Sequence, residues 1–291
     1  MTRSGRIALA GRPNVGKSSL LNAIIGTPLA IVSPKPQATQ LPVTGIHTVG
    51  DTQLVLVDLP GLFDPGFPLQ RSLRQLALDQ LRTIDLILHL HPAADAPAPD
   101  LLTLAPDAAP IKAGVVTVYT KADLVSAERR AALTTSGALM TDIHRPETIT
   151  ALLAALAQRL PERPFQHPTD DLATQPVRFF VGEYLREGAF DALEEELPYA
   201  LAAEVDEFDE DREPVYIRAT LFVERESQKG IVIGRGGATL KRIGSHARVR
   251  LEALLGQRVY LETRVKVLPR WRRDKTMLAR FGFPVPDDES H

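Results

Sequence analysis

An eight-residue stretch, GRPNVGKS at positions 11–18, limits the possible fold more than any other part of this sequence. It has two glycines, then Lys and Ser, and it stands between the apolar run RIALAG and the helical pattern KSSLLNAIIG. In a strand–loop–helix context, backbone N–H groups of such a loop point at phosphate oxygens. We expect Lys17 to neutralise β- and γ-phosphate oxygens and Ser18 to offer its hydroxyl to Mg²⁺. The sequence therefore predicts a nucleotide phosphate site.

Apolar runs alternate with helical patterns up to about residue 160. The stretches 85–91 and 114–120 are continuously apolar, which is typical of strands buried on both faces of a sheet. Helical patterns occupy 70–83 and 146–160. This alternation predicts an α/β domain with a doubly wound, mostly parallel sheet.

Two further elements fit the phosphate site. DLPG, residues 58–61, ends a predicted strand, so Asp58 can hold Mg²⁺ through water and Gly61 can offer its N–H to a γ-phosphate. The polar, proline-interrupted stretch 33–47 between the motifs predicts a mobile loop, in which Thr39 is the candidate for a second Mg²⁺ hydroxyl. We therefore expect Ser18, Thr39 and Asp58 at the metal. The residues expected to act directly in hydrolysis are Lys17, Thr39 and Gly61.

TKAD, residues 120–123, completes the nucleotide motifs. A buried Asp123 can accept two hydrogen bonds from guanine, whereas adenine offers no such pair, so ATP is rejected. Lys121 can lay its stem along the base. The sequence therefore predicts a site for GTP and GDP. Its predicted residues are Gly11, Arg12, Pro13, Asn14, Val15, Gly16, Lys17, Ser18, Ser19, Asp58, Leu59, Pro60, Gly61, Leu62, Thr120, Lys121, Ala122 and Asp123.

Beyond residue 160 the pattern changes. Residues 160–178 contain four prolines without periodicity, which indicates a linker or a strap. We then expect a helix over 177–194, strands over 199–208, 214–224 and 257–268, two helices around a glycine cluster, and a last helix. That order predicts an α+β domain.

Charge in this second half is unevenly distributed. Glu187–Glu213 holds twelve acidic residues and one basic residue, while Arg225–Arg280 holds fifteen basic and four acidic residues. The basic stretch contains a G-x-x-G loop between two predicted helices, which lets a nucleic-acid backbone approach closely. Ile231, Ile233 and Ile243 can floor a groove for unstacked bases. The alternative to RNA binding is that these basic residues only form the solvent-exposed face of two helices. The predicted RNA-binding residues are Lys229, Ile233, Gly234, Arg235, Gly236, Gly237, Lys241 and Arg242.

The order of phosphate loop, Thr39, DLPG and TKAD resembles the translation-factor-related GTPases, and GIVIGRGGATLKRIG (residues 230–244) looks like part of a type II KH domain. Together the two halves resemble the Era family of bacterial ribosome-assembly GTPases. This resemblance implies binding near the 3′ end of 16S ribosomal RNA, a role in maturation of the 30S subunit, and a cytoplasmic monomer. It leaves peripheral contact with the inner face of the cell membrane open. It also implies K⁺ near the phosphates, held with help from Asn14.

The chain departs from the family pattern at several points. Thr120 replaces the usual Asn, and Ala38, Thr39 and Gln40 stand where Thr-Thr-Arg is usual. No Gln follows Gly61, so no glutamine there orients the attacking water, and we expect slow intrinsic turnover. The loop over the guanine has two candidates, residues 135–138 and residues 141–142.

Composition sets outer limits. The chain has no cysteine, which excludes disulfides, thiolate metal sites and cysteine nucleophiles. The N-terminus lacks the apolar core of a secretory signal, and no run reaches the ~18 apolar residues of a membrane span. We expect a GTPase domain over 1–165, a linker over 166–176 and a KH domain with a C-terminal helix over 177–291.

Two other functions stay open at this stage. The chain could be an RNA-binding scaffold with a weakly active or inactive GTPase site, as the changes at Thr120, Ala38 and Gln40 suggest. It could also be a GTPase of transfer RNA modification, although such proteins lack a KH half.

Overall fold

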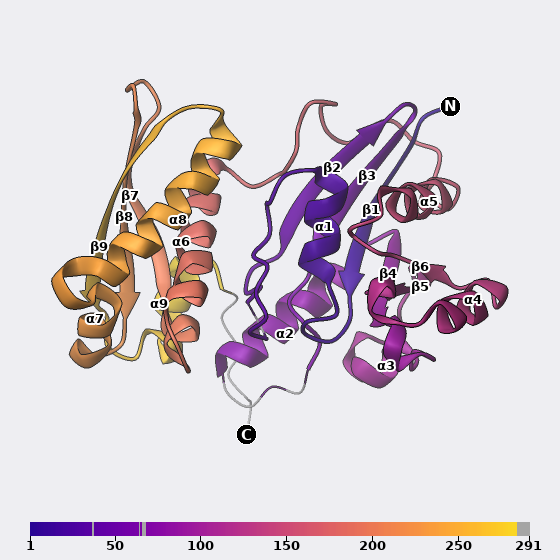
Figure 1. Cartoon of the computed structure of the whole chain (residues 1–291), viewed down its shortest axis with the longest axis horizontal. Coiled ribbons are helices and arrows are strands. Elements are labelled where there is room, and N and C mark those ends of the chain that lie inside the picture. Colours follow the sequence, from indigo (N-terminus) through magenta and orange to yellow (C-terminus); the bar gives the residue numbers. More distant parts are fainter. Residues whose placement is uncertain (37, 64, 66–67, 284–291) are drawn as a thin grey trace. The chain divides into compact units, whose positions relative to one another are not determined.

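The computed structural model describes residues 1–36, 38–63, 65 and 68–283. The chain divides into two compact units (Figure 1). Unit 1 comprises Met1–Ala30, Thr39–Gly66 and Leu73–Thr174, and unit 2 comprises Ile31–Ala38, Phe67–Ser72 and Gln175–His291.

Unit 1 contains a six-stranded sheet in the order β2-β3-β1-β4-β5-β6. Every neighbouring pair is parallel except β2–β3. The doubly wound, mostly parallel sheet expected from the sequence is therefore confirmed. The strands are β1 (Arg3–Ala10), β2 (Val43–Val49), β3 (Thr52–Asp58), β4 (Leu86–Pro92), β5 (Gly114–Thr120) and β6 (Leu139–Met140).

Strand β2 corrects the sequence prediction, which placed a mobile loop over 33–47. Residues 43–49 pair antiparallel with β3 along their whole length. Gly45 explains why the strand fits there: a Cβ at this position would lie within 3 Å of side-chain atoms of Leu21 and Ile25. The prolines and the glycine in this stretch hide the alternation that would have predicted a strand.

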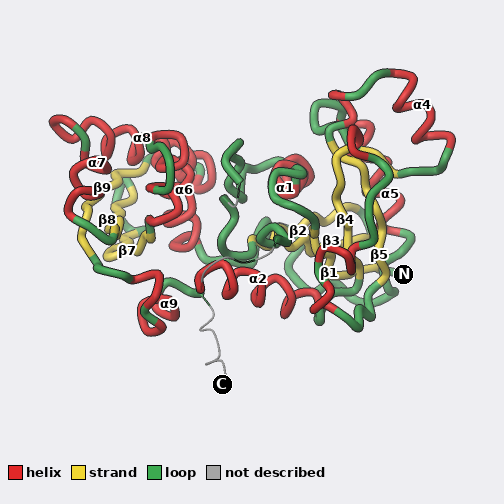
Figure 2. Tube along the Cα trace, turned by 90° about the horizontal axis from the view of Figure 1, so that it is seen from below, coloured by secondary structure: helices red, strands yellow, loops and turns green. Residues whose placement is uncertain are grey.

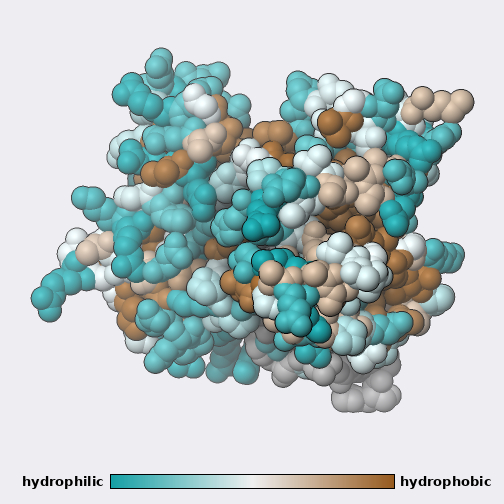
Figure 3. All heavy atoms as spheres, turned by 45° about the vertical axis from the view of Figure 1, so that its right-hand side comes forward, coloured by the Kyte–Doolittle hydropathy of each residue, from teal (hydrophilic) through white to brown (hydrophobic). Residues whose placement is uncertain are grey.

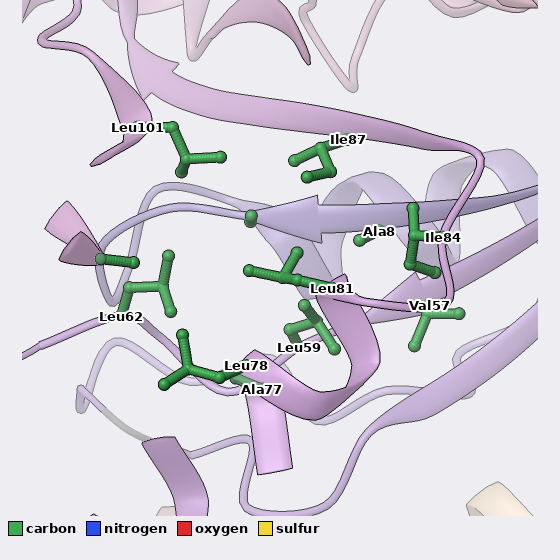
Figure 4. Close-up of a cluster of buried hydrophobic side chains, with 12 residues drawn as sticks. Ala8, Val57, Leu59, Leu62, Ala77, Leu78, Leu81, Ile84, Ile87 and Leu101 are labelled. Carbon is green, nitrogen blue, oxygen red and sulfur yellow. The ribbon is translucent and has the colours of Figure 1, made fainter. Parts of the chain in front are cut away.

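Five α-helices accompany this sheet: α1 (Lys17–Ile25), α2 (Pro68–Leu81), α3 (Leu101–Leu104), α4 (Ala127–Thr135) and α5 (Pro146–Ala157). Ala77, Leu78 and Leu81 of α2 pack on Ala8, Val57, Leu59 and Ile87 of the strands and their ends (Figure 4). This packing buries the α2 side of the sheet. By contrast, α4 buries none of its residues and lies at the periphery of unit 1 (Figure 2).

Unit 2 has a three-stranded sheet in the order β7-β8-β9, with β7–β8 antiparallel and β8–β9 parallel. The expected α+β order is confirmed. Its elements are α6 (Val177–Ala192), β7 (Ala202–Asp209), β8 (Val215–Val223), α7 (Glu226–Ile233), α8 (Ala238–Leu255), β9 (Val259–Val267) and α9 (Lys275–Arg280).

Helices α6 and α8 pack closely at Gly188. A Cβ at this position would lie 2.9 Å from the carbonyl oxygen of Ile243 and 3.2 Å from Cβ of His246. The glycine therefore sets the separation of the two helices. Much of α6 is buried, including the charged side chains of Glu183, Arg186 and Glu187.

Hydrophobic residues form several separate groups among hydrophilic ones on the face drawn in Figure 3. Within the described ranges, no helix has the length and apolar character needed to cross a bilayer.

We predict that Gly188→Ala lowers the free energy of unfolding of unit 2 by about 1–3 kcal/mol, because the added methyl group meets backbone atoms of α8 rather than a mobile side chain. Trp271 is the one tryptophan of the chain and is fully buried, with its indole N–H donated to the carbonyl of Ala200. Urea unfolding followed by its fluorescence reports on this unit.

Gly230→Ala, inside α7, is the matched control, because its Cβ would meet no atom of the described residues within 4 Å. Alanine there should raise stability by up to about 1 kcal/mol. Equal midpoints for both variants would contradict the packing argument.

Candidate functional site

The phosphate loop joins the end of β1 to the start of α1. Gly11 has φ 146°, and a Cβ there would lie 2.5 Å from the carbonyl oxygen of Leu90 in β4. Gly16 precedes α1 with φ 98°, in the left-handed region that side chains disfavour. Both glycines are therefore required by the path of the loop, and the loop places the first N–H groups of α1 where a phosphate is bound.

Lys17 is the first residue of α1 and is buried, with 6% of its surface exposed. Its Nζ donates to the carbonyls of Gly11 (3.4 Å) and Arg12 (3.0 Å). Burial lowers the pKa of Lys17 from 10.5 to about 8, although the Asp58 carboxylate acts in the opposite direction. The ammonium is thus held beneath the loop, poorly solvated and only modestly stabilised by carbonyl dipoles.

The three predicted metal ligands converge. The Ser18 hydroxyl donates to Oδ2 of Asp58 at 2.6 Å and lies 3.0 Å from Oγ1 of Thr39. Thr39 Oγ1 in turn lies 3.4 Å from the same carboxylate oxygen. Two hydroxyls and a carboxylate gathered this way form the hard-oxygen set that Mg²⁺ prefers.

The DLPG loop packs on the phosphate loop. A Cβ at Gly61 would lie 2.8–3.0 Å from atoms of Pro13, and the Leu62 N–H donates to the carbonyl of Gly11 at 3.0 Å. Leu59, Pro60 and Leu62 are buried, whereas Arg12 and Asn14 are exposed and Ser19 is partly exposed.

Thr120 braces the phosphate loop. Its hydroxyl donates to the carbonyl of Val15 at 2.6 Å, and Lys121 Nζ donates to the carbonyl of Asn14 at 2.7 Å. Lys121 has a left-handed φ of 55°, which turns the chain out of β5. The Thr side chain at this position, where the family usually has Asn, is thus hydrogen-bonded to the phosphate loop.

Asp123 corrects one expectation. The sequence suggested a buried carboxylate, but Asp123 is exposed in a short turn after β5, and only Ala122 beside it is buried. The turn follows the last residue of β5, and the side chain of Asp123 points to solvent there.

The loop following β6 settles an alternative that the sequence left open. The Thr141 N–H donates to the carbonyl of Tyr119, and the Ala122 N–H donates to the carbonyl of Thr141. Residues 141–142 therefore lie beside TKAD, while residues 135–138 form the end of α4 and the turn after it. A two-residue strand leaves too weak a pattern for sequence reasoning to find.

The G-x-x-G loop joins α7 to α8, as expected. Gly234, Gly236 and Gly237 all have positive φ, and a Cβ at Gly234 would overlap Oγ1 of Thr239 at 2.3 Å. No atom of the described part of the chain lies within 4 Å of a Cβ built at Gly236 or Gly237, so this face is open to a ligand backbone.

Side chains around this loop match the prediction in part. Arg235, Lys241 and Arg242 are exposed, and Lys229 is partly exposed. Arg242 also donates to the carbonyl of Asp191. The prediction that Ile243 lies in the groove floor is wrong, because this side chain is fully buried in the core of unit 2. Its backbone packs on Gly188 of α6. Ile231 is 54% exposed and Ile233 partly exposed, so these two can form the apolar floor.

Comparison with known proteins gives a family match for each half of the chain. A family model described as 50S ribosome-binding GTPase matches residues 6–121, and one described as KH domain matches residues 196–272. GTPase Era of Mycobacterium avium is 40% identical over 296 residues, covering 97% of this chain and 99% of the relative. The chain belongs to the Era GTPases. The Era protein of Mycobacterium tuberculosis is 38% identical over 295 residues, covering 96% of this chain and 98% of its own length.

Two solved Era structures share the fold across both units. Aquifex aeolicus Era bound to GDP·AlF₄⁻ has a TM-score of 0.85 and 32% identity, covering 97% of this chain and 99% of that one. A complex of Era with MgGDPNP and nucleotides 1506–1542 of 16S ribosomal RNA gives the same values. The expected Era fold, a P-loop GTPase domain followed by a KH domain, is therefore confirmed. A transfer RNA modification GTPase without a KH half does not fit.

We predict that Thr120→Val weakens GDP binding about three- to tenfold, because the Val15 carbonyl loses its buried donor. Thr120→Asn should retain binding, since the amide can donate to the same carbonyl. Dissociation constants for a fluorescent GDP measure the effect.

Thr117→Val, a Thr in the same strand, is the control and should bind GDP like the parent protein. An unchanged affinity in Thr120→Val would show that the brace contributes nothing to nucleotide binding.

A second prediction follows from the pKa of about 8 for Lys17. Bound phosphates stabilise the ammonium, so the pKa of Lys17 rises on binding. Above pH 8 the nucleotide-free protein has lost this proton and must take it up again, so GDP affinity falls as pH rises. Calorimetry in buffers of different ionisation enthalpy, at about pH 7 and about pH 8.5, measures the proton uptake. Binding without proton uptake at the higher pH would refute this assignment.

Proposed function

We propose that this Era-family chain is a GTP-hydrolysing switch that binds 16S ribosomal RNA near its 3′ end and assists assembly of the 30S subunit. One observation carries the proposal: a complete Ser18–Thr39–Asp58 cluster in unit 1 and an open G-x-x-G loop in unit 2 occur in the same chain. The Era complex with MgGDPNP and nucleotides 1506–1542 of 16S ribosomal RNA supports both halves of it.

GTP or GDP with Mg²⁺ fits the residues of unit 1. Ser18, Thr39 and Asp58 are the side chains that would hold the metal, because their oxygens already gather at one point. Mg²⁺ supplies positive charge that neutralises phosphate oxygens as the γ-phosphoryl group is transferred.

The protein's own groups account for the remainder of the expected chemistry. Lys17 and the N–H groups at the start of α1 neutralise phosphate charge, and the N–H of Gly61 is offered to the γ-phosphate. Leu62 and Phe63 follow Gly61, so this loop has no carboxamide to orient the attacking water, and we expect slow intrinsic turnover. K⁺ held near the phosphates with help from Asn14 is part of the same proposal.

Single-stranded RNA fits unit 2 better than a duplex. The glycines admit a nucleic-acid backbone, Arg235 and Lys241 offer cations, and Ile231 with Ile233 offers apolar surface to unstacked bases. A duplex keeps its bases stacked and withholds them from such a groove.

The finer expectations belong to this proposal as well. They are a GTPase domain over 1–165, a linker over 166–176, a KH domain over 177–291, a cytoplasmic monomer, and peripheral contact with the inner face of the cell membrane. The rival function, an RNA-binding scaffold with an inactive GTPase site, is less well supported, because Thr120 and Thr39 keep the contacts that such a site needs.

We predict that replacing both Arg235 and Gly236 with Asp weakens binding of single-stranded RNA by at least about tenfold, because carboxylates then face phosphates and side chains block close approach. The measurement is a salt titration of affinity for nucleotides 1506–1542 of 16S ribosomal RNA, a scrambled RNA and a duplex.

Lys266→Asp is the control, since Lys266 is an exposed cation on β9 of the same unit. It should cost much less affinity. If the parent protein bound all three RNAs with equal affinity and the double variant were unaffected, the basic surface would not be an RNA-binding site.

A further inference from the structure

Residues 31–38 precede the metal-ligand candidate Thr39 in sequence but belong to unit 2 rather than unit 1. Ile31 and Ala38 are buried and form an apolar cluster with Phe190 of α6, against which Tyr199 packs. The Phe190 and Tyr199 rings meet edge to face at 5.1 Å. The two ends of this segment are therefore packed in the apolar core of unit 2.

Lys35 fastens the middle of the segment to the end of α6. Its Nζ donates to the carbonyls of Phe190, at 2.7 Å, and of Leu193. These are carbonyls that the helix leaves without an intrahelical partner, at the end where its dipole favours a cation. Lys35 thus caps α6 from another part of the chain.

Arg186 fastens the end of the segment. One guanidinium nitrogen donates to the carbonyl of Ala38 at 3.1 Å, and another donates to Glu183 at 2.7 Å. Arg186 and Glu183 are both about 95% buried, so the guanidinium has little freedom to turn away. The carbonyl it holds is the one whose carbon is bonded to the nitrogen of Thr39.

A single peptide bond therefore separates the Arg186 contact from the metal-ligand candidate Thr39. Consecutive Cα atoms are only about 3.8 Å apart, so holding the Ala38 carbonyl restricts where the Thr39 hydroxyl can be. The Thr39 hydroxyl lies 3.0 Å from that of Ser18.

We propose that Lys35 and Arg186 are positioning residues for hydrolysis: they anchor the segment that immediately precedes Thr39 and so restrict where the Thr39 hydroxyl can lie. This inference rests on the proposed function. It predicts that steps needing Thr39 depend on the Lys35 and Arg186 contacts, whereas GDP binding, which involves no γ-phosphate, does not.

The test compares full-length variants. Lys35→Met removes both donor bonds but keeps the length of the side chain, and Lys35→Arg restores a donor. A double variant, Glu183→Gln with Arg186→Gln, removes the guanidinium without leaving a buried carboxylate unpaired. Arg159→Met is the matched control, because Arg159 donates to the Ala155 carbonyl of α5, away from the nucleotide motifs.

Single-turnover GTP hydrolysis is measured as a function of Mg²⁺, beside GDP affinity and Trp271 fluorescence. Lys35→Met and the double variant should lower the hydrolysis rate and raise the half-saturating Mg²⁺ concentration, each by about tenfold. Lys35→Arg and Arg159→Met should match the parent protein, and GDP affinity should stay within about twofold in all variants.

Two failures are distinguishable. A parent protein that does not hydrolyse GTP overturns the proposed function itself. Only the anchoring role is overturned if the parent protein hydrolyses GTP and the Lys35→Met and double variants depend on Mg²⁺ in the same way as Arg159→Met. The anchoring role would also be overturned if Lys35→Met and the double variant lost GDP binding together with hydrolysis, or if both lost the native Trp271 fluorescence. Lys35 and Arg186 would then serve the general stability of the fold.

Discussion

The parallel pairing of β3, β1, β4 and β5 is the constraint on which the nucleotide site depends. Because the strands run the same way, their carboxyl ends meet at one edge, and Ala10, Asp58 and Thr120 end three of them there. The loops that follow are then so close that Gly11 and Gly61 leave no room for a Cβ. Backbone atoms of the loops therefore pack directly on one another at this edge.

This dependence explains which parts of the site the sequence predicts. Lys17, Ser18 and Asp58 were predictable, because each stands at a fixed position relative to a strong strand or helix pattern. The antiparallel strand β2 was not, since Gly45 and nearby prolines interrupt its alternation and its place is fixed by Leu21 and Ile25 of α1. The burial of Ile243 and the exposure of Asp123 likewise depend on tertiary packing, about which local sequence says little.

The two charged stretches of unit 2 partly neutralise each other. Glu187 pairs with Arg250 and lies beside His246, and Glu204 pairs with Arg280, so two of the cations counted along the sequence have an acidic partner here. Arg235 and Lys241 beside the G-x-x-G loop are instead exposed to solvent.

The proline-rich stretch after α5 has a role that its composition conceals. Gln53 bonds to residues 166 and 167, the Ile46 N–H donates to the carbonyl of Leu172, and Thr174 donates to the carbonyl of Thr44. The stretch therefore covers the outer edge of β2 with partial strand pairing. An uncovered edge strand invites pairing with other chains. A fragment of the GTPase domain that stops before residue 174 would expose this edge and be prone to aggregate, so the useful end point for expressing that domain alone lies beyond the strap.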